Sequence, residues 1–201
     1  MSKLPLSFYQ GTDVNRLAVQ LLGKRLYTCI GGVVTGGIIV ETEAYNGVED
    51  KASHAYGGRF TDRTKVMYEQ GGLSYVYLCY GIHHLFNVVT APQGTPHAVL
   101  VRGLEPLEGL DVMLERRNMS AIKPNLTAGP GALAKAMGID RGLNAKDLGG
   151  DEIWIADGGL IFRDDEIVSS PRVGVDYAGD HALLPWRYYV KGNRFVSKPN
   201  S

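Results

Sequence analysis

The residues best suited to chemistry lie in the sequence ETEAY at residues 41–45, which directly follows the apolar run 37–40. Residues two apart in a strand point to the same face of its sheet, so we expect Glu43 and Tyr45 to lie side by side. This pair offers a carboxylate that can take a proton from water next to an aromatic ring on which a base can stack. A strand that emerges into solvent carries the same residue types, so a purely structural role is the alternative.

A histidine and an arginine follow in the glycine-rich sequence ASHAYGGR. His54 can donate a hydrogen bond to a phosphate or sugar oxygen of a nucleotide, and the guanidinium of Arg59 can bind a phosphate. A loop histidine that only braces its neighbours is the structural alternative.

Tyrosines dominate the next run, LSYVYLCYG at residues 73–81. By strand alternation Tyr75 and Tyr77 share one face, whereas Tyr80 lies on the other face at a turn with Gly81. A tyrosine at the tip of a hairpin can insert between stacked bases, as the apolar side chains of minor-groove-binding proteins do. Packing within the protein is the alternative.

The adjacent histidines His83 and His84 do not predict a metal site, because neighbouring strand residues point to opposite faces. Phosphate-binding, nucleophile-elbow and dinucleotide-binding sequences are absent, so we expect neither a metal nor another cofactor. A metal-dependent hydrolase that combines these histidines with His54 and Glu43 is kept as an alternative.

Periodicity and turn residues predict the elements that must position these side chains. Gly31-Gly32 suits a two-residue hairpin turn. Strands are expected over 25–30, 33–45, 73–80, 84–91, 97–104, 153–156 and 160–162, and helices over 13–22, 62–69, 106–117 and 130–137, with a last helical turn or two after residue 179. We therefore predict one α+β domain over residues 1–201, a curved antiparallel sheet surrounded by helices with a protruding β-hairpin, and flexible ends at 1–10 and 197–201.

Composition sets the remaining limits. The chain has 201 residues, 44% of them hydrophobic, which fits a single domain. Its formal net charge is zero, but residues 51–65 and 172–198 each carry a net charge of +3, and residues 146–166 carry −5. A polyanion responds to the charge of such stretches and not to the net charge of the whole chain. The alternative is that these charged side chains are scattered over the surface and only solvated, because that would give the same net charge for each stretch. The N-terminus lacks an apolar signal core and no run approaches a membrane span, so we expect a cytoplasmic protein that does not enter membranes.

Several ordered motifs together resemble the alkyladenine, or 3-methyladenine, DNA glycosylase family. They are VETEAY, SHAYGGRFTDR, LSYVYLCYGIHHLFNVV, VLVRGLEP, AGPGALAKAMGI and PRVGVDYAG, and the likeness extends from about residue 17 to residue 196. It implies a monofunctional hydrolase of base-excision repair that flips alkylated or deaminated purines out of double-stranded DNA and leaves an abasic site. The implied lesions are of the 3-methyladenine, 7-methylguanine, hypoxanthine and ethenoadenine class. A monomer without an obligate protein partner, associated with the nucleoid when bound to DNA, is the default expectation.

The resemblance also implies how water and DNA are handled. Glu43 matches the glutamate that activates the attacking water, and Arg102 and the backbone carbonyl of Val175 match groups that help to hold that water. Tyr80 matches the residue that inserts into the minor groove. The alternative is a nucleic-acid-binding module without catalysis, in which the tyrosines stack bases and Glu43 is structural.

For the base-binding pocket, the resemblance implies that Tyr45 and Tyr77 stack on the two faces of the flipped base. His54 matches the histidine that bounds the pocket and contacts the nucleotide. Asn87 matches the pocket-wall residue that opposes the exocyclic amine of normal guanine.

Overall fold

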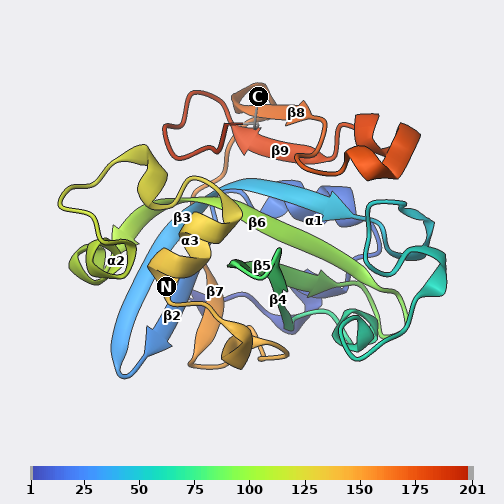
Figure 1. Ribbon diagram of the computed structural model, residues 1–201, viewed down its shortest axis with the longest axis horizontal. Helices are drawn as coiled ribbons and strands as arrows, with labels where there is room; N and C mark the ends of the chain where they lie inside the picture. Colours follow the sequence, from blue (N-terminus) through green and yellow to red (C-terminus); the bar gives the residue numbers. More distant parts are fainter. Residues whose placement is uncertain (1, 199–201) are drawn as a thin grey trace.

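Strand β3 (Val33–Tyr45) runs through the middle of a curved, nine-stranded antiparallel sheet (Figure 1). The computed structural model describes residues 2–198, and in this part of the chain the strand order is β1-β7-β2-β3-β6-β5-β4, with β9 paired to β3 and β8 paired to β9. The other strands are β1 (Ser2–Lys3), β2 (Arg25–Ile30), β4 (Ser74–Cys79), β5 (His83–Thr90), β6 (His97–Glu108), β7 (Ile153–Asp157), β8 (Ile167–Ser170) and β9 (Arg187–Val190). The predicted α+β class and curved antiparallel sheet are confirmed.

The two edges of β3 explain how its catalytic candidates are enclosed. β2 pairs with the first half of β3 through the predicted turn, in which Gly31 and Gly32 both have positive φ, as such a turn requires. β2 is shorter than β3, and β9 pairs with the exposed second half of that edge at residues 41–43. The helical turn expected after residue 179 is present as the 3-10 helix Asp176–Leu183, but it does not extend to Tyr188 and Tyr189, because the open edge of β3 pairs with this segment over a long sequence distance.

β6 pairs with the opposite edge of β3, and this ladder contains bulges on both strands. Ile39 pairs with Leu104 and Glu41 with Gly103, which leaves Val40 as an extra residue on β3. Thr42 then pairs with Val101, which leaves Arg102 as an extra residue on β6. A bulge turns a side chain away from strict alternation, so the direction of Arg102 could not be predicted from sequence spacing.

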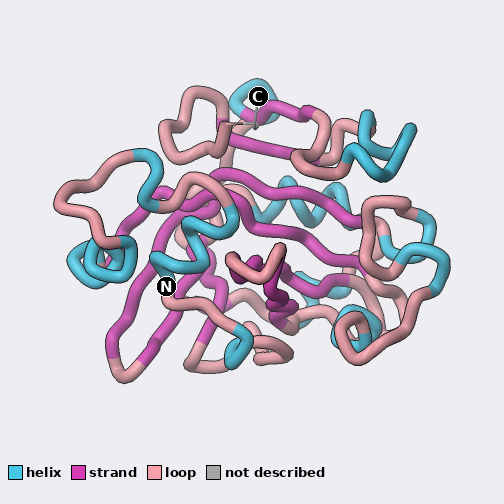
Figure 2. Tube along the Cα trace, in the orientation of Figure 1, coloured by secondary structure: helices cyan, strands magenta, loops and turns pink. Residues whose placement is uncertain are grey.

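Three α-helices, α1 (Val14–Leu21), α2 (Leu110–Arg117) and α3 (Pro130–Met137), accompany the sheet in the described residues (Figure 2). The side chain of Asp13 caps α1 by accepting from the backbone N–H of Arg16 at 3.0 Å. α1 packs on β3, where the Thr42 hydroxyl donates to the Ala18 carbonyl at 2.9 Å. Because Thr42 faces α1, alternation directs its neighbours Glu41 and Glu43 to the other face.

Several predicted boundaries need correction. The helix expected over 106–117 begins at Leu110, because β6 continues to Glu108 and pairs with β3 to its end. Residues 160–162 are not a strand, and the region 62–69 contains a short 3-10 helix, Lys65–Tyr68. Residues 2–10, expected to be flexible, form β1 and the 3-10 helix Leu6–Gln10, whereas residues 1 and 199–201 lie outside the described part.

The β4–β5 hairpin is the predicted protruding hairpin and lies at the centre of the view in Figure 1, beside α3. Tyr80 at its tip has 89% of its surface exposed. Over residues 2–198, helices that are both long and apolar enough to cross a bilayer are absent.

Candidate active site

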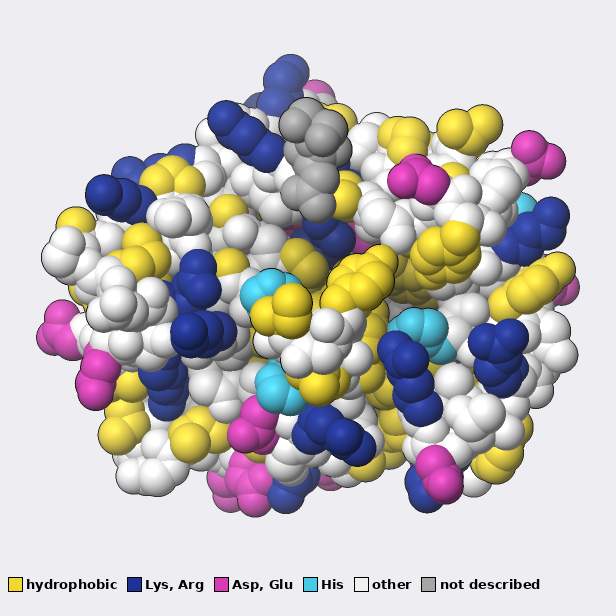
Figure 3. Space-filling model, in the orientation of Figure 1, with side chains coloured by type: hydrophobic (Ala, Val, Ile, Leu, Met, Phe, Trp, Pro, Cys, Tyr) yellow, Lys and Arg dark blue, Asp and Glu magenta, His cyan; other side chains and the backbone are white. Residues whose placement is uncertain are grey.

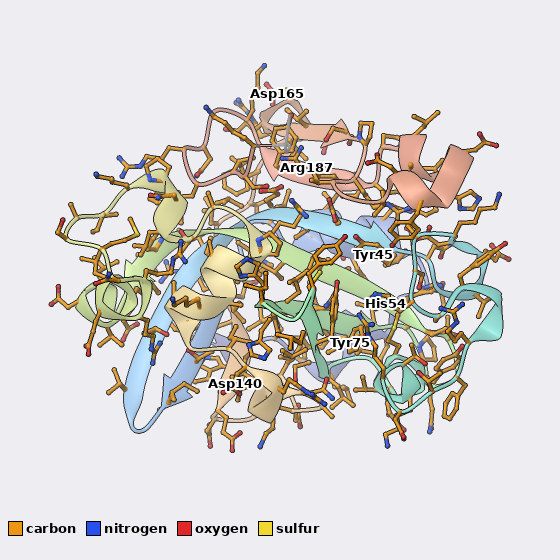
Figure 4. All side chains as sticks on the ribbon, viewed as in Figure 1. Tyr45, His54, Tyr75, Asp140, Asp165 and Arg187 are labelled. Carbon is orange, nitrogen blue, oxygen red and sulfur yellow. The ribbon has the colours of Figure 1, made fainter. Side chains whose placement is uncertain are left out.

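A pocket opens beside the end of β3, and its walls come from β3, β4, β5, β6, the loop after β3 and the 3-10 helix Asp176–Leu183. Its enclosed volume is about 40 Å³, which is room for a few water molecules. The lining residues are Tyr45, Ala52, Ser53, His54, Met67, Tyr75, Tyr77, Asn87, Ala98 and Tyr177. Figure 4 shows Tyr45, His54 and Tyr75 gathered at this end of the sheet, far from the labelled Asp140 and Asp165.

Glu43 lies directly behind the Tyr45 wall of this pocket and has no exposed surface. Its Oε2 accepts a hydrogen bond from the Tyr45 hydroxyl at 2.9 Å, as the alternation of β3 predicts for neighbours on one face. Its Oε1 accepts from the backbone N–H of Val173 at 2.7 Å and forms an ion pair with Arg102 Nη1 at 3.3 Å. A buried carboxylate needs such donors and a compensating positive charge.

Arg102 belongs to a second layer of buried charge behind Glu43. Its Nε donates to Glu41 Oε1 at 2.9 Å, and Arg187 Nε from β9 donates to the same oxygen at 2.7 Å. Burial alone would lower the pKa of the Arg102 guanidinium, but Glu43 and Glu41 outweigh that effect and raise this pKa above its usual value. Arg102 is therefore a permanent positive charge beside the carboxylate of Glu43.

Tyr45 is fixed on the side of the site formed by residues 172–186. The Arg172 guanidinium stacks on the Tyr45 ring at 4.8 Å and forms a bidentate ion pair with the buried Asp50. Burial, reinforced by the charge of Glu43, raises the pKa of the Tyr45 hydroxyl well above its usual value. The hydroxyl therefore stays protonated and serves as a donor to Glu43.

His54 is neutral at physiological pH in this environment. Burial, with smaller contributions from Arg63 and Arg59, lowers the pKa of its imidazole to about 4. Arg63 Nη2 lies 3.2 Å from His54 Nε2, and because a guanidinium has no acceptor, Nε2 must accept this bond. The ring proton is then on Nδ1, which donates to the Tyr75 hydroxyl at 2.8 Å.

Tyr77 forms the pocket wall next to His54, with the two ring centroids 4.7 Å apart in an edge-to-face arrangement. Arg63 stacks on the Tyr77 ring at 4.8 Å, so each of the two tyrosines expected to hold a base has an arginine against it. Asn87 closes the wall on β5, where its side-chain amide donates to the Tyr75 carbonyl at 3.1 Å. The structure thus brings the sequence-predicted pocket residues Tyr45, His54, Tyr77 and Asn87 to one cavity.

The DNA-binding candidates lie on the surface around the pocket mouth. Tyr80 has a φ of 50°, a left-handed conformation that is uncommon for a bulky side chain, and Ile82 beside it is 73% exposed. Arg59 is exposed in the loop after β3. In Figure 3, hydrophobic and histidine side chains gather over the hairpin at the centre of the view, and Lys and Arg side chains flank them on both sides.

The segment PRVGVDYAG meets Glu43 differently from the expectation. Val173 contacts the carboxylate, through its N–H, whereas the carbonyl of Val175 accepts from the backbone N–H of Ala178 at 2.8 Å. Val175 begins the 3-10 helix Asp176–Leu183 and is buried against Ala52 and Ala178. The Val175 carbonyl has a second lone pair beyond this bond, so its expected contribution to the water site stays a prediction.

Sequence reasoning missed four polar residues of the site: Glu41, Arg63, Arg172 and Arg187. Glu41 stands two residues before Glu43, which was the one available signal, since strand neighbours two apart share a face. The three arginines reach the site from separate segments, and their sequence positions alone carry no signal of that convergence.

In the described part of the chain, the side chains that the metal-dependent alternative needs as ligands do not come together. In residues 2–198, groups of three or more His, Cys, Asp or Glu side chains that could hold a metal ion are absent. Both ring nitrogens of His54 are already occupied by Arg63 and Tyr75, and His83 packs against Gly131 of α3.

Comparison with known proteins gives one consistent result. Residues 7–194 match the family model described as "Methylpurine-DNA glycosylase (MPG)". A protein of Bacillus cereus (strain G9842) named "Putative 3-methyladenine DNA glycosylase" is 47% identical over 208 residues, which cover 96% of this chain and 98% of that protein. A protein of the same name from Bacillus anthracis (strain CDC 684 / NRRL 3495) is 46% identical over 202 residues, with the same coverage.

Proposed function

Because the chain belongs to the methylpurine-DNA glycosylase family, and is thus a DNA-repair hydrolase of N-glycosyl bonds, we propose that it excises alkylated and deaminated purines from duplex DNA with a water activated by Glu43. The substrates are double-stranded DNA with 3-methyladenine, 7-methylguanine, hypoxanthine or ethenoadenine. The product is an abasic site, and the enzyme acts as a monomer.

The observation that carries this proposal is a buried carboxylate directly behind a pocket of aromatic walls. Glu43 Oε2 accepts one hydrogen bond, from Tyr45, and a carboxylate oxygen has two acceptor positions. We place the attacking water at this second position, next to the hydroxyl of Tyr45, whose side chain lines the pocket. Arg102 and the Val173 N–H hold the other oxygen and thereby fix the carboxylate plane.

Bond cleavage follows from this arrangement. As the bond between C1′ and the purine nitrogen breaks, its electron pair leaves with the base and positive charge develops on the sugar. Water oxygen attacks C1′ while Glu43 accepts the proton, and the carboxylate also stabilises the positive sugar. Lysine is absent from the residues that line the pocket, which supports hydrolysis by water without a Schiff base and without strand cleavage.

The walls of the pocket favour bases that are already cationic. An N3- or N7-alkylated purine carries a positive charge, and aromatic faces such as those of Tyr45 and Tyr77 attract cations. Such a base also leaves without further protonation. His54 and the two tyrosines cannot supply a proton efficiently near pH 7, because the pKa of His54 is about 4 and burial raises the pKa of both tyrosines. We therefore expect neutral lesions such as hypoxanthine to be excised more slowly than cationic ones.

Extrusion of the nucleotide is assigned to the β4–β5 hairpin. Flipping a base costs a few kcal/mol of lost stacking, and a side chain that fills the gap offsets part of this cost. Tyr80 is aromatic, exposed and at the tip of a hairpin beside the pocket mouth, which supports its insertion into the minor groove. Arg59 lies close enough to His54 to act on its charge and is placed to bind a phosphate at the rim.

The decisive experiment is Glu43→Gln, which keeps the shape of the side chain and removes the base. We expect single-turnover release of an alkylated purine to fall by roughly 100-fold to 10,000-fold, while binding to duplex DNA with an abasic-site analogue is retained. Glu49→Gln makes the same change at an exposed carboxylate and should leave the rate unaltered. Base release by Glu43→Gln at the wild-type rate would exclude the proposed role of Glu43, and failure of the wild-type protein to release bases would favour the non-catalytic DNA-binding alternative.

A further inference from the structure

Arg102 is held at three positions of its guanidinium group by three different partners. Nε donates to Glu41 at 2.9 Å, Nη2 donates to Ser197 Oγ at 3.2 Å, and Nη1 lies 3.3 Å from Glu43. A guanidinium is planar and rigid, so two fixed nitrogens also determine where the third one lies. The contacts with Glu41 and Ser197 therefore set how Arg102 meets Glu43.

Glu41 is itself fixed on all sides. It has no exposed surface, its Oε1 accepts from Arg187 Nε at 2.7 Å and from the Ser197 hydroxyl at 2.7 Å, and its Oε2 accepts from the Ser197 N–H at 2.6 Å. Two buried carboxylates two residues apart on one face repel each other unless cations separate them. Arg102 lies between Glu41 and Glu43 and interacts with both.

Ser197 comes from the segment that follows β9 and crosses the β3–β6 ladder next to Arg102. The carbonyl oxygen of Phe195 approaches Gly103 so closely that a Cβ at residue 103 would lie 2.6 Å from it. This close approach brings Ser197 between Glu41 and Arg102, where its hydroxyl accepts from Arg102 and donates to Glu41.

We propose that Glu41 and Ser197 are positioning residues of the glycosylase reaction: they hold Arg102 in the orientation that keeps the Glu43 carboxylate aligned with the attacking water. This inference rests on the proposed role of Glu43. Neither residue lines the pocket, so both act through Arg102. A displacement of about 1 Å at a reacting group can cost on the order of 100-fold in rate.

The test compares single-turnover excision with affinity for abasic-analogue duplex in Ser197→Ala, Ser197→Thr and Glu41→Gln. We expect Ser197→Ala to lower the excision rate by about 10-fold and Glu41→Gln by about 100-fold, with abasic-duplex affinity unchanged. Ser197→Thr keeps the hydroxyl and should restore the rate. If Glu41→Gln does not fold, the two Ser197 variants carry the test, because Ser197→Ala removes one hydroxyl only.

Glu105→Gln is the matched control for Glu41→Gln. Glu105 lies on β6 and, like Glu41, holds the segment after β9, by accepting from the Asn193 side chain at 2.7 Å, but it does not bond to Arg102. We expect its excision rate to equal that of the wild type.

Two results would overturn the inference. One is a wild-type excision rate in Ser197→Ala. The other is a lowered excision rate in Ser197→Ala that is equally low in Ser197→Thr and in Glu105→Gln. The segment after β9 would then only support the structure. Glu43→Gln in the same assay separates the two proposals: if it is active, the proposed role of Glu43 fails, whereas if it is inactive and Ser197→Ala is normal, the positioning role alone fails.

Discussion

His54 shows how neighbouring residues decide the charge of a catalytic-site side chain. Arg63 occupies one ring nitrogen and Tyr75 the other, and burial together with Arg63 and Arg59 keeps the imidazole neutral. The sequence predicted that His54 bounds the pocket. The partner on its Nε2 could not be predicted, because Arg63 follows nine residues later across an irregular loop.

The lowered pKa of His54 predicts a pH effect on stability. In the unfolded chain a histidine has its ordinary pKa of 6.5, whereas burial and the neighbouring arginines lower the pKa of folded His54 to about 4. Between these values the unfolded state binds a proton that the folded state does not, so the free energy of unfolding decreases as the pH falls from 6.5 to 4. We therefore expect the free energy of unfolding, measured with urea, to fall less between pH 7.5 and pH 4.5 in His54→Asn than in the wild type.

A second, partly buried histidine, His97, does not affect this comparison. Burial lowers its pKa as well, but it is present in both proteins, so its contribution cancels in the comparison. Equal losses of stability in the wild type and in His54→Asn would show that His54 titrates normally in the folded protein.

At the scale of elements, strand alternation predicted the pairing of Glu43 with Tyr45 and of Tyr75 with Tyr77 on the pocket side. The same rule could not predict Arg102, because a bulge in β6 changes its direction. β8 and β9 were also missed. Each has only four residues, and β9 exists because β2 is too short to cover the edge of β3.

The β4–β5 hairpin gives a prediction at this scale. Tyr80→Asn removes the aromatic ring and keeps a residue type that tolerates the positive φ of this turn. Excision from fully paired duplex should fall by about 10-fold, because stacking on the exposed ring is lost, while stability changes by less than about 0.5 kcal/mol. Single-turnover excision and thermal unfolding measure the two effects.

A matched control for the hairpin is Ile161→Ser, which removes another highly exposed apolar side chain, 81% exposed, from the loop after β7. Its excision rate should equal that of the wild type. Unchanged duplex activity in Tyr80→Asn would remove the insertion role from this tyrosine.

Across the whole molecule, a net charge of zero hides an uneven distribution. Arg63 of the basic stretch 51–65 contacts His54 and Tyr77 of the pocket, whereas the acidic stretch 146–166 includes β7 and the chain that leads to β8. The net charge of each stretch can be read from the sequence, but only the fold shows that an arginine of the first stretch lies against the pocket. A protein with a net charge of zero can therefore still orient a polyanion, because its basic stretch attracts the polyanion and its acidic stretch repels it.

A salt titration of DNA binding tests this arrangement. Each phosphate contact contributes about 0.9 to the slope of log affinity against log salt concentration, so Arg59→Ala should reduce that slope by about one unit. Arg163→Ala is the control, because Arg163 pairs with Asp165 and Glu166 in the acidic stretch and should leave the slope unchanged. Equal slopes for all three proteins would mean that Arg59 does not contact phosphate.

The use of β9 to complete the edge of β3 has a consequence for protein synthesis. Glu41 is separated from Arg187 by 146 residues and from Ser197 by 156 residues. While a ribosome is still translating the intervening chain, Glu41 has neither the guanidinium of Arg187 to balance its charge nor the Ser197 hydroxyl to donate a hydrogen bond to it. A nascent polypeptide halted before that point lacks two of the partners that accompany the burial of this carboxylate, so the buried charge cluster is completed only with translation of these late residues.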